Sequence, residues 1–248
     1  MPISDSERQL KHSSVSENGQ HFLTPDQLAA IRQFDTCTIA NAIEQFGVRL
    51  RNEGFTRPGL RCVTGGSPRL LGYAATFRIR SSDPPMSGNA YLDRTDWWGA
   101  LEQLPVPRVA VIQDIEAGSG LGSAMGEVHA AILKALRCDG VITNGTVRDI
   151  PGVTEMQFPA FASGVAVSHS YMHVVDYGAP VEIFGLRIHS GTLLYADCHG
   201  VVSIPLEIAG ELPKVASQLH AKERRIIDLC QSPGFSPEKL LHAIKSTK

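Results

Sequence analysis

An arginine followed directly by an aspartate, Arg148-Asp149, is the pair of residues in this sequence with the clearest chemical potential. The pair closes residues 144–149, which follow the short apolar run 139–143. That run predicts a buried strand, and open α/β sheets bind ligands beyond the carboxyl ends of such strands. Arginine offers a cationic fork to a carboxylate or enolate oxygen, and aspartate offers a hard oxygen to a divalent cation. A surface ion pair or a turn cap is the alternative interpretation.

A glycine-rich loop is the second candidate for ligand binding. Glycines 118, 120 and 122 lie between the apolar run 108–115 and residues 124–137, whose apolar positions recur at helical spacing. Backbone N–H groups of such a loop, together with the positive end of a helix dipole, favour a carboxylate or a phosphate. A tight strand-to-helix turn explains the same residues equally well. No nicotinamide cofactor is expected, because Ser123 or Met125 stands where the dinucleotide motif requires its third glycine.

The segments around these motifs predict an α/β fold. Residues 70–79 and 108–115 are expected to be buried strands, and 139–143 completes a βαβ unit with parallel pairing. Shorter strands are expected at 160–167, 180–183, 193–197 and 201–204. A first helix is expected to be capped by Thr24 and Gln27 and to carry Leu28, Ile31 and Phe34. Further helices are expected at 38–46, at 206–230 with an interruption at Pro213, and at 237–245.

Length and composition indicate one large domain with tails. We expect a polar N-terminal arm at 1–22, an α/β domain at 23–231 and a C-terminal helical tail at 232–248, out of 248 residues. A net charge of -2 gives no reason to expect nucleic acid or a membrane surface as partner, so a small molecule or another subunit is expected. We expect neither secretion nor membrane insertion, because residues 1–20 contain no apolar segment and no uninterrupted apolar stretch approaches about 18 residues. Five scattered cysteines are interpreted as buried thiols, which favours a cytoplasmic protein.

Several motifs together resemble the RraA-like family. In the family's order, they are the glycine loop with Gly126-Glu127, Asp139-Gly140-Val141, and the segments at 144–149 (NGTVRD), 158–162 (FPAFA) and 196–205 (ADCHGVVSIP). The resemblance covers roughly residues 36–225 and implies one layered β/β/α domain with a mixed central sheet. The family contains 4-hydroxy-4-methyl-2-oxoglutarate/4-carboxy-4-hydroxy-2-oxoadipate aldolases, which also decarboxylate oxaloacetate. It also contains non-catalytic regulators of ribonuclease E.

The resemblance implies a class II type of carbon–carbon lyase for a carboxylated 2-keto acid. Asp149 would bind Mg²⁺ or Mn²⁺, and Arg148 would bind the substrate and stabilise a pyruvate enolate. An acidic residue 21 positions before the arginine serves proton transfer in the aldolases, and here that residue is Glu127. Backbone N–H groups would hold the pyruvyl carboxylate, and the residues concerned are Gly122, Ser123, Ala124, Met125 and Gly126.

The same family implies a site shared between subunits. Its members assemble as homotrimers or homohexamers, and its aldolases borrow a glutamate from the C-terminal helix of a neighbouring subunit. Glu223 is the nearest match to that glutamate in this chain. We therefore expect a homo-oligomer.

Three positions depart from the family's pattern. Glu127 stands where the aldolases typically have Asp, Asn144 where Asp is common, and residues 190–192 (SGT) where Pro-Gly-Asp is common. One extra methylene at position 127 can displace a proton-transfer group by more than an ångström, which is costly for positioning. Two alternatives therefore stay open. One is a non-catalytic regulatory protein of the same fold, and the other is a lyase or hydratase acting on another small acid.

Several other residues could take part in chemistry, but structural roles are favoured for most of them. His169 and His173 are four residues apart, a spacing that places both on one helix face and suits zinc, but no third ligand follows, so a capping or specificity role is favoured. His199 beside Asp197 is interpreted as structural, and the tryptophan pair at 97–98 as packing. Arg80 is a possible second contact for a substrate carboxylate. Ser168 and Ser190 lack the Gly-x-Ser-x-Gly context of a hydrolase.

Overall fold

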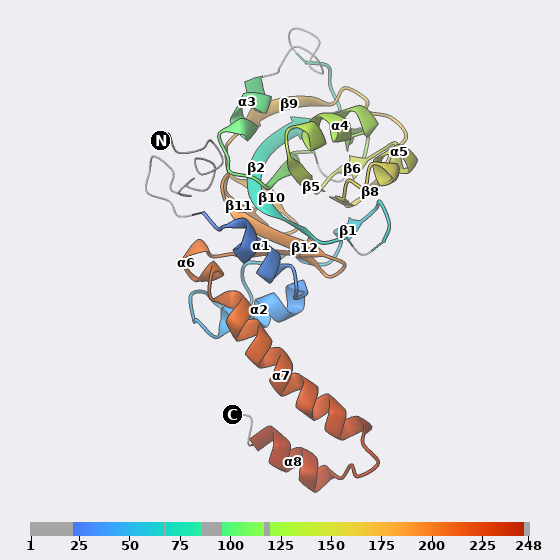
Figure 1. Cartoon of the computed structure of the whole chain (residues 1–248). Coiled ribbons are helices and arrows are strands. Elements are labelled where there is room, and N and C mark those ends of the chain that lie inside the picture. The colour runs from blue at the N-terminus through green and yellow to red at the C-terminus, as the bar shows by residue number, and fades with distance from the viewer. Residues whose placement is uncertain (1–21, 67, 86–95, 117–119, 246–248) are drawn as a thin grey trace, which may run out of the picture.

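A mixed sheet forms the centre of the protein (Figure 1). The computed structural model describes residues 22–66, 68–85, 96–116 and 120–245, so the expected arm at 1–22 lies almost wholly outside the described residues. The strand order is β1-β7-β5-β3-β2-β12-β13, and β9 also pairs with β2. These strands are β1 (Arg61–Cys62), β2 (Leu70–Arg80), β3 (Arg108–Asp114), β5 (Cys138–Thr143), β7 (Ala160–Ala162), β9 (His173–Tyr177), β12 (Leu193–Asp197) and β13 (Gly200–Ile204).

Parallel pairing confirms the predicted βαβ unit. Strand β3 pairs in parallel with both β2 and β5, and β5 pairs in parallel with β7. The connection from β3 to β5 passes through helix α4 (Glu127–Ala135), which packs on β5. Strands β12 and β13 add an antiparallel side to the same sheet, so the fold class is the mixed α/β one that was expected.

A second, small parallel sheet lies beside the first one. It consists of β4 (Ser123–Met125), β6 (Thr146–Val147) and β8 (Gly164–Val165), in the order β4-β6-β8. The expectation that residues 123–126 open a helix is wrong. Residues 123–125 are buried and pair with β6, and Gly126 is extended, so the helix begins only at Glu127. Pairing with a distant segment thus overrides the local helical pattern.

Helices cover the sheet from two directions. Helices α3 (Asp96–Glu102), α4 and α5 (Ile150–Glu155) pack on β2, β3 and β5 in one core cluster. Helices α1 (Pro25–Ile31), α2 (Thr36–Glu44), α6 (Leu206–Ala209) and the start of α7 (Leu212–Gln231) lie near β12 and β13. Trp97 packs edge to face on Phe77, with their ring centroids 4.9 Å apart, which confirms the packing interpretation of the tryptophan pair. The β10–β11 hairpin (Val181–Ile183 and Leu186–Ile188) completes the described strands.

Several predicted boundaries need correction. Helix α1 ends at Ile31, before Phe34. Helix α2 begins at Thr36, two residues early, because the Asp35 carboxylate accepts a hydrogen bond from the Thr38 N–H at 2.7 Å and caps it. The expected strand at 160–167 is split between β7 and β8. The expected interruption of the helical run 206–230 occurs just before Pro213, because α6 ends at Ala209 and α7 begins at Leu212, with Pro213 in its first turn, where proline is tolerated.

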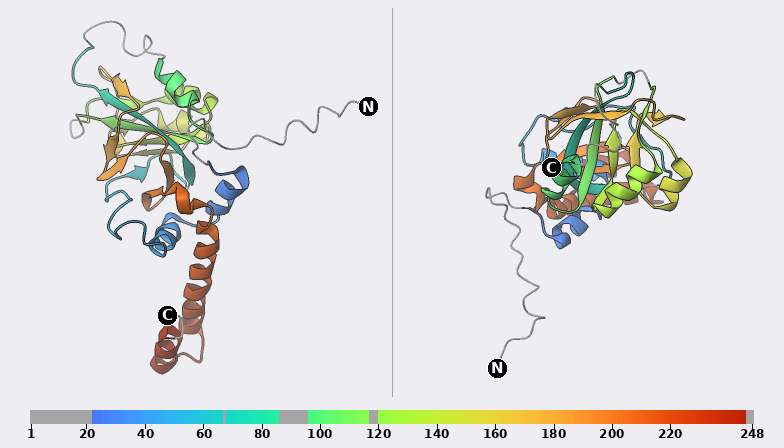
Figure 2. Two further views of the ribbon diagram at one scale, coloured as in Figure 1. Left: turned by 90° about the vertical axis from the view of Figure 1, so that its left-hand side faces the viewer. Right: turned by 90° about the horizontal axis from the view of Figure 1, so that it is seen from above.

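The last two helices project from the rest of the protein (Figure 1, Figure 2). Helix α7 contacts α2 near its start and then leads to α8 (Pro237–Lys245), which packs back on α7. No residue of α8 is buried. Among the described residues, no helix combines the length and the apolar character that crossing a bilayer requires.

The cysteines are all free thiols, but the prediction that they are buried is wrong for three of them. Cys138 is buried and Cys62 half-buried. Cys37, Cys198 and Cys230 are exposed, because they lie on the first turn of α2, on the turn after β12 and near the projecting end of α7.

Candidate active site

Arg148 and Asp149 lie in the turn that joins β6 to α5. Asp149 is the residue before α5 and has left-handed backbone angles, with φ of 56° and ψ of 38°. That conformation costs about 1 kcal/mol for a residue with a side chain, although aspartate adopts it more readily than most. Backbone strain of this kind is typical of functional sites, where the surrounding structure holds it in place.

The Asp149 carboxylate joins two elements. Its Oδ2 atom accepts a hydrogen bond from the Glu127 N–H at 3.1 Å and lies 3.3 Å from Arg148 Nε. Helix α4 has Gly126 at its N-cap, so Asp149 supplies the acceptor that a capping side chain would otherwise provide. The positive end of the helix dipole favours a carboxylate there. Among the described residues, the Oδ1 atom has no hydrogen-bond partner, and the side chain is 38% exposed.

The Arg148 guanidinium has hydrogen-bond donors that the described residues do not use. Its Nε atom faces Asp149, whereas its two terminal nitrogens have no partner among the residues that the structure describes. The side chain is 34% exposed. A planar fork with free donors is suited to a carboxylate or an enolate oxygen.

Two glycines leave the space that the Asp149 and Glu127 carboxylates occupy. A Cβ atom at Gly126 would overlap Asp149 Oδ2 and lie 3.1 Å from Arg148 Nε. A Cβ atom at Gly152, in α5, would lie 2.5 Å from the Cδ atom of the Glu127 carboxylate. Glu127 thus meets Asp149 through its backbone N–H, whereas its carboxylate packs on Gly152 of α5, so the common site expected for the three side chains stays a prediction.

The backbone segment predicted to hold a carboxylate lies next to this cluster as a strand. Met125 O accepts a hydrogen bond from the Arg148 N–H at 2.9 Å, and the Ser123 N–H donates to Ser168 O at 3.0 Å. All five residues of the segment are buried. The amide of Ser123 is thus used within the protein, and the helix dipole acts at Glu127 instead of at residue 123.

Glu223 does not reach the cluster within one chain. It is exposed on α7, which leads away from α4 and α5 (Figure 1). The structure thus leaves its expected role, in the site of a neighbouring subunit, as a prediction.

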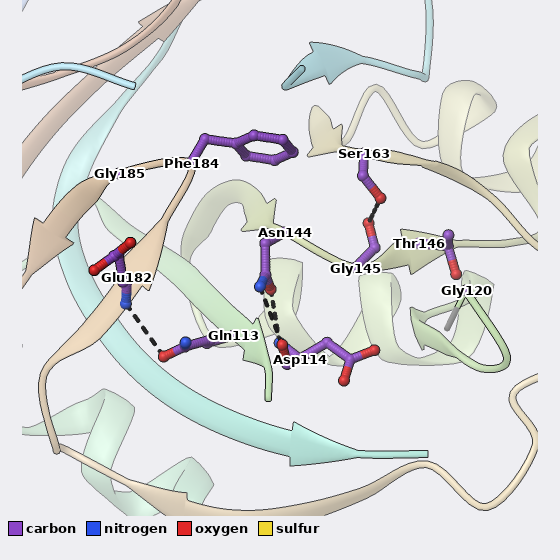
Figure 3. A pocket seen from close by; sticks show the side chains of 10 residues that line it. All are labelled: Gln113, Asp114, Gly120, Asn144, Gly145, Thr146, Ser163, Glu182, Phe184 and Gly185. Atoms are coloured by element: carbon purple, nitrogen blue, oxygen red, sulfur yellow. Dashed lines mark hydrogen bonds between the residues drawn. The ribbon is translucent and has the colours of Figure 1, made fainter. Parts of the chain in front are cut away.

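A cavity of about 710 Å³ lies at the carboxyl ends of β3 and β5 (Figure 3), and Arg148, Asp149 and Glu127 are not among the residues that line it. Asn144 links the two strand ends at this cavity. Its side-chain amide accepts a hydrogen bond from the Asp114 N–H at 2.7 Å and donates one to Asp114 O at 3.0 Å. The amide thus continues the β3–β5 pairing by one more step. Thr146, also at the cavity, donates to Gly122 O at 3.2 Å and fixes the strand β6 beside the glycine loop.

Asp114 is a cavity residue that sequence reasoning missed. It is only 2% exposed, and burial raises the pKa of its carboxyl group above the usual range. A signal was available, because Asp114 lies near the end of the apolar run 108–115, at the edge where α/β sheets bind ligands. Glu182, from the β10–β11 hairpin, lines the same cavity and had no comparable signal.

Arg80 forms an ion pair with Glu116. Its Nε atom lies 3.3 Å from Glu116 Oε1. The Glu116 carboxylate also accepts hydrogen bonds from the backbone N–H groups of Ser81 and Ser82 and from the Ser82 hydroxyl, and these contacts lower its pKa to about 2.

The histidine pair does not share a helix face. His169 lies in a turn and His173 begins β9, and their Nδ1 atoms contact the carbonyl oxygens of Ser170 and Tyr171 at 2.7 and 2.8 Å. The helical spacing argument is therefore wrong at these positions.

Comparison with known proteins places the chain in a family. The RraA-like family model, described as Aldolase/RraA, matches residues 36–203, and the chain belongs to this family. An uncharacterized protein of Methanocaldococcus jannaschii is 30% identical over 192 residues, which are 75% of this chain and 86% of the relative. A Halalkalibacterium halodurans protein named "Putative 4-hydroxy-4-methyl-2-oxoglutarate aldolase" is 26% identical over 122 residues, 47% of this chain and 58% of that protein.

Solved structures confirm the fold. A protein of Pseudomonas syringae pv. tomato matches with a TM-score of 0.65 and 23% identity, over 88% of this chain and 98% of its own. Streptomyces coelicolor RraAS2, described as an unusual member of the RNase ES inhibitor RraA protein family, matches with a TM-score of 0.66 and 20% identity. That match covers 83% of this chain and 97% of the other. The family thus includes both aldolases and ribonuclease regulators.

Proposed function

We propose that this protein is a divalent-metal-dependent carbon–carbon lyase. Its substrate would be a carboxylated 2-keto acid, cleaved by a retro-aldol or a decarboxylation step to a pyruvate enolate. The observation that carries this proposal is the Arg148–Asp149 pair at the start of α4, in which the Arg148 terminal nitrogens and Asp149 Oδ1 have no partner among the described residues. The name of the H. halodurans relative supports the same reaction class.

The donor at Asp149 fits magnesium or manganese. Carboxylate oxygen is the ligand that these hard cations prefer, and magnesium is often held by one or two carboxylates together with water and substrate. Asp149 Oδ1 is partly exposed, and Gly126 leaves the adjacent space without a side chain. The ion, when bound, would act as a Lewis acid on the keto group of the substrate.

Two side chains of the protein would take part in the reaction, Arg148 by stabilising negative charge and Glu127 by transferring a proton. The free Arg148 nitrogens would bind an oxygen whose negative charge grows as the carbon–carbon bond breaks, so their attraction is stronger in the transition state than in the ground state. In the retro-aldol step Glu127, held over Gly152, would accept the proton of the substrate hydroxyl group as the carbon–carbon bond breaks and would return it to the enolate carbon to give pyruvate. Glu223 of a neighbouring subunit would add a second carboxylate to the site.

A regulatory, non-catalytic protein is the second candidate, and two observations favour it. Asp149 Oδ2 already has partners without a cation, since it caps α4 and pairs with Arg148, so the aspartate has a structural role of its own. The other observation is Glu127 at a position where the aldolases typically have Asp.

Metal binding separates the two candidates. We expect Mn²⁺, followed by electron paramagnetic resonance, to bind the wild-type protein, with a loss of at least about tenfold in affinity for Asp149→Ala. Asp26→Ala, at an exposed position in α1, is the matched control and should bind Mn²⁺ like the wild type. Equal Mn²⁺ affinity of the wild type and Asp149→Ala would overturn the lyase proposal.

A further inference from the structure

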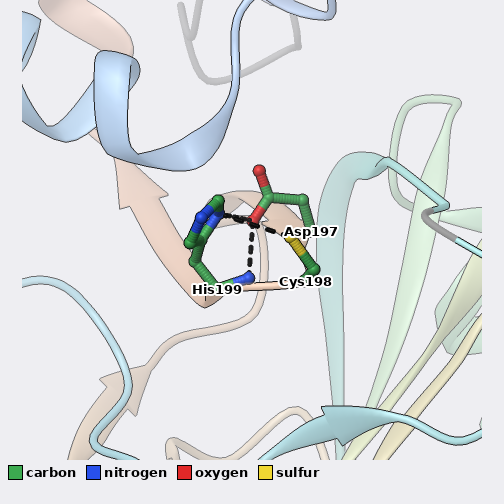
Figure 4. A group of neighbouring side chains, drawn as sticks. All are labelled: Asp197, Cys198 and His199. Atoms are coloured by element: carbon green, nitrogen blue, oxygen red, sulfur yellow. Dashed lines mark hydrogen bonds and ion pairs between the residues drawn. The ribbon is translucent and has the colours of Figure 1, made fainter.

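The turn between β12 and β13 carries three consecutive side chains that meet in space (Figure 4). One ligand atom from each of Asp197, Cys198 and His199 lies within 4.8 Å of the others. Cys198 Sγ is 3.6 Å from His199 Nδ1, which is 3.0 Å from Asp197 Oδ1. Thiolate, imidazole and carboxylate are the three ligand types that bind zinc in proteins.

The spacing of the sulfur and nitrogen atoms suits a tetrahedral ion. With metal–sulfur and metal–nitrogen bonds of about 2.3 and 2.0 Å, the two ligand atoms of a tetrahedral zinc site are about 3.5 Å apart. The observed 3.6 Å therefore needs little adjustment of either side chain. His199 Nδ1 and Asp197 Oδ1 are at hydrogen-bond distance, and a divalent cation bound by both atoms would replace that hydrogen bond.

Helix α2 holds the carboxylate of this group in position. Asp197 is 5% exposed, and it accepts hydrogen bonds from the Thr36 N–H at 2.8 Å and the Thr36 hydroxyl at 2.7 Å. Hydrogen bonds of this kind orient metal ligands in characterised sites. The thiol of Cys198 and the ring of His199 are exposed, so an ion from solution can reach them.

A second thiol is close by. Cys37, on the first turn of α2, lines a cavity of about 270 Å³ together with His199. The Cys37 thiol would complete a set of four ligands by turning across this cavity towards His199.

We propose that Asp197, Cys198 and His199 form a binding site for a zinc-class transition-metal ion, with Cys37 as the additional thiolate ligand. The site is chemically distinct from the oxygen site at Asp149, because sulfur and nitrogen ligands select zinc and its neighbours over magnesium. It lies on the α2 side of the sheet. Binding would join α2 to the β12–β13 turn and release protons from the thiols.

Cobalt(II) titration of the full-length protein under reducing conditions tests this site. Cobalt replaces zinc and reports a thiolate ligand as near-ultraviolet charge-transfer absorption. We expect that absorption in the wild type, with loss on adding Zn²⁺. Cys198→Ser and His199→Ala should weaken cobalt binding at least about tenfold, and Cys37→Ser should reduce the thiolate band by about half.

Matched controls separate this site from others. Cys230→Ser removes an exposed thiol on α7, and Asp149→Ala removes the proposed magnesium ligand, so both should keep the wild-type band. Zn²⁺ should raise the melting temperature of the wild type and leave that of Cys198→Ser unchanged. No band in the wild type, or an undiminished band in Cys198→Ser, would overturn the proposal. An unchanged band in Cys37→Ser would remove Cys37 from the ligand set.

Discussion

Gly126 is the residue on which the geometry of the Arg148-Asp149 pair depends most. Its backbone angles are open to alanine, with φ of -127°, but a Cβ atom would overlap Asp149 Oδ2. We expect Gly126→Ala to fold and to displace the carboxylate, with a fall of about 100-fold in lyase kcat/KM, as expected for misplacement by about 1 Å. Gly164→Ala, where the added atom meets nothing within 4 Å, should be unaffected. Full activity in Gly126→Ala would show that the position of Asp149 does not matter.

His129 gives the protein a pH-dependent stability. It is 8% exposed on α4, and burial lowers its pKa to about 4 from 6.5. The unfolded chain then binds more protons than the native protein between these values, so stability falls as the pH drops through that window. We expect a loss of about 2 kcal/mol in the free energy of unfolding from pH 7 to pH 5.

Urea unfolding at several pH values checks this expectation. His129→Gln should flatten the dependence between pH 7 and pH 5, whereas His220→Gln, at an exposed position on α7, should leave it as in the wild type. A slope that is the same in His129→Gln would assign the dependence to other groups.

At the scale of elements, Asn144 extends the pairing of β3 with β5. Its amide both accepts from and donates to the Asp114 backbone, so an aspartate there, common in the family, would face Asp114 O without a proton to donate. We expect Asn144→Asp to lower the free energy of unfolding by about 1–3 kcal/mol at pH 7, measured in urea. The same change at the exposed Asn41 should cost little. Equal stability of the two variants would contradict this account.

Local sequence signals predicted the elements that depend mainly on their own residues. The capping box at Thr24 and Gln27 is present with both hydrogen bonds, and β2, β3, β5 and α8 occur close to the expected positions. Strand β4 was not predictable, because its three residues are strand only through pairing with β6, which follows some twenty residues later. Strand β9 likewise depends on its partner β2, about a hundred residues earlier.

The candidate site was predictable in part for a related reason. Arg148 and Asp149 are adjacent, and the family spacing pointed to Glu127. The burial of Asp114 and the pairing of Arg80 with Glu116 depend on contacts between distant segments, which no motif in one sequence reveals.

At the scale of the whole molecule, the projecting α7–α8 hairpin is the feature that a single chain leaves unexplained. It exposes apolar side chains that usually mark contacts between proteins, and these include Ile227, Phe235, Leu241 and Ile244. Glu223 lies on the same hairpin. A neighbouring copy that covers these residues would place Glu223 near a site other than its own, as the proposed function requires.

Subunit complementation tests this arrangement. Arg148→Ala and Glu223→Ala should each be inactive alone. Co-expressed, they should recover about a quarter of wild-type activity, because that fraction of shared sites receives both intact residues in a closed ring. Arg148→Ala with Asp149→Ala should recover nothing, since both residues come from one chain. Absence of recovery in the first pair, with mixed oligomers verified, would show that Glu223 does not act in the site of a neighbouring subunit.

The central claim is a metal-dependent lyase site at Arg148 and Asp149, and pyruvate release tests it most directly. We would supply 4-hydroxy-4-methyl-2-oxoglutarate and, separately, oxaloacetate, each with Mg²⁺, with chelator, and with Asp149→Ala. The account predicts turnover with Mg²⁺ that chelator abolishes and that Asp149→Ala lacks. Turnover that persists in chelator or in Asp149→Ala would contradict it, as would a wild-type protein that neither releases pyruvate nor binds the metal.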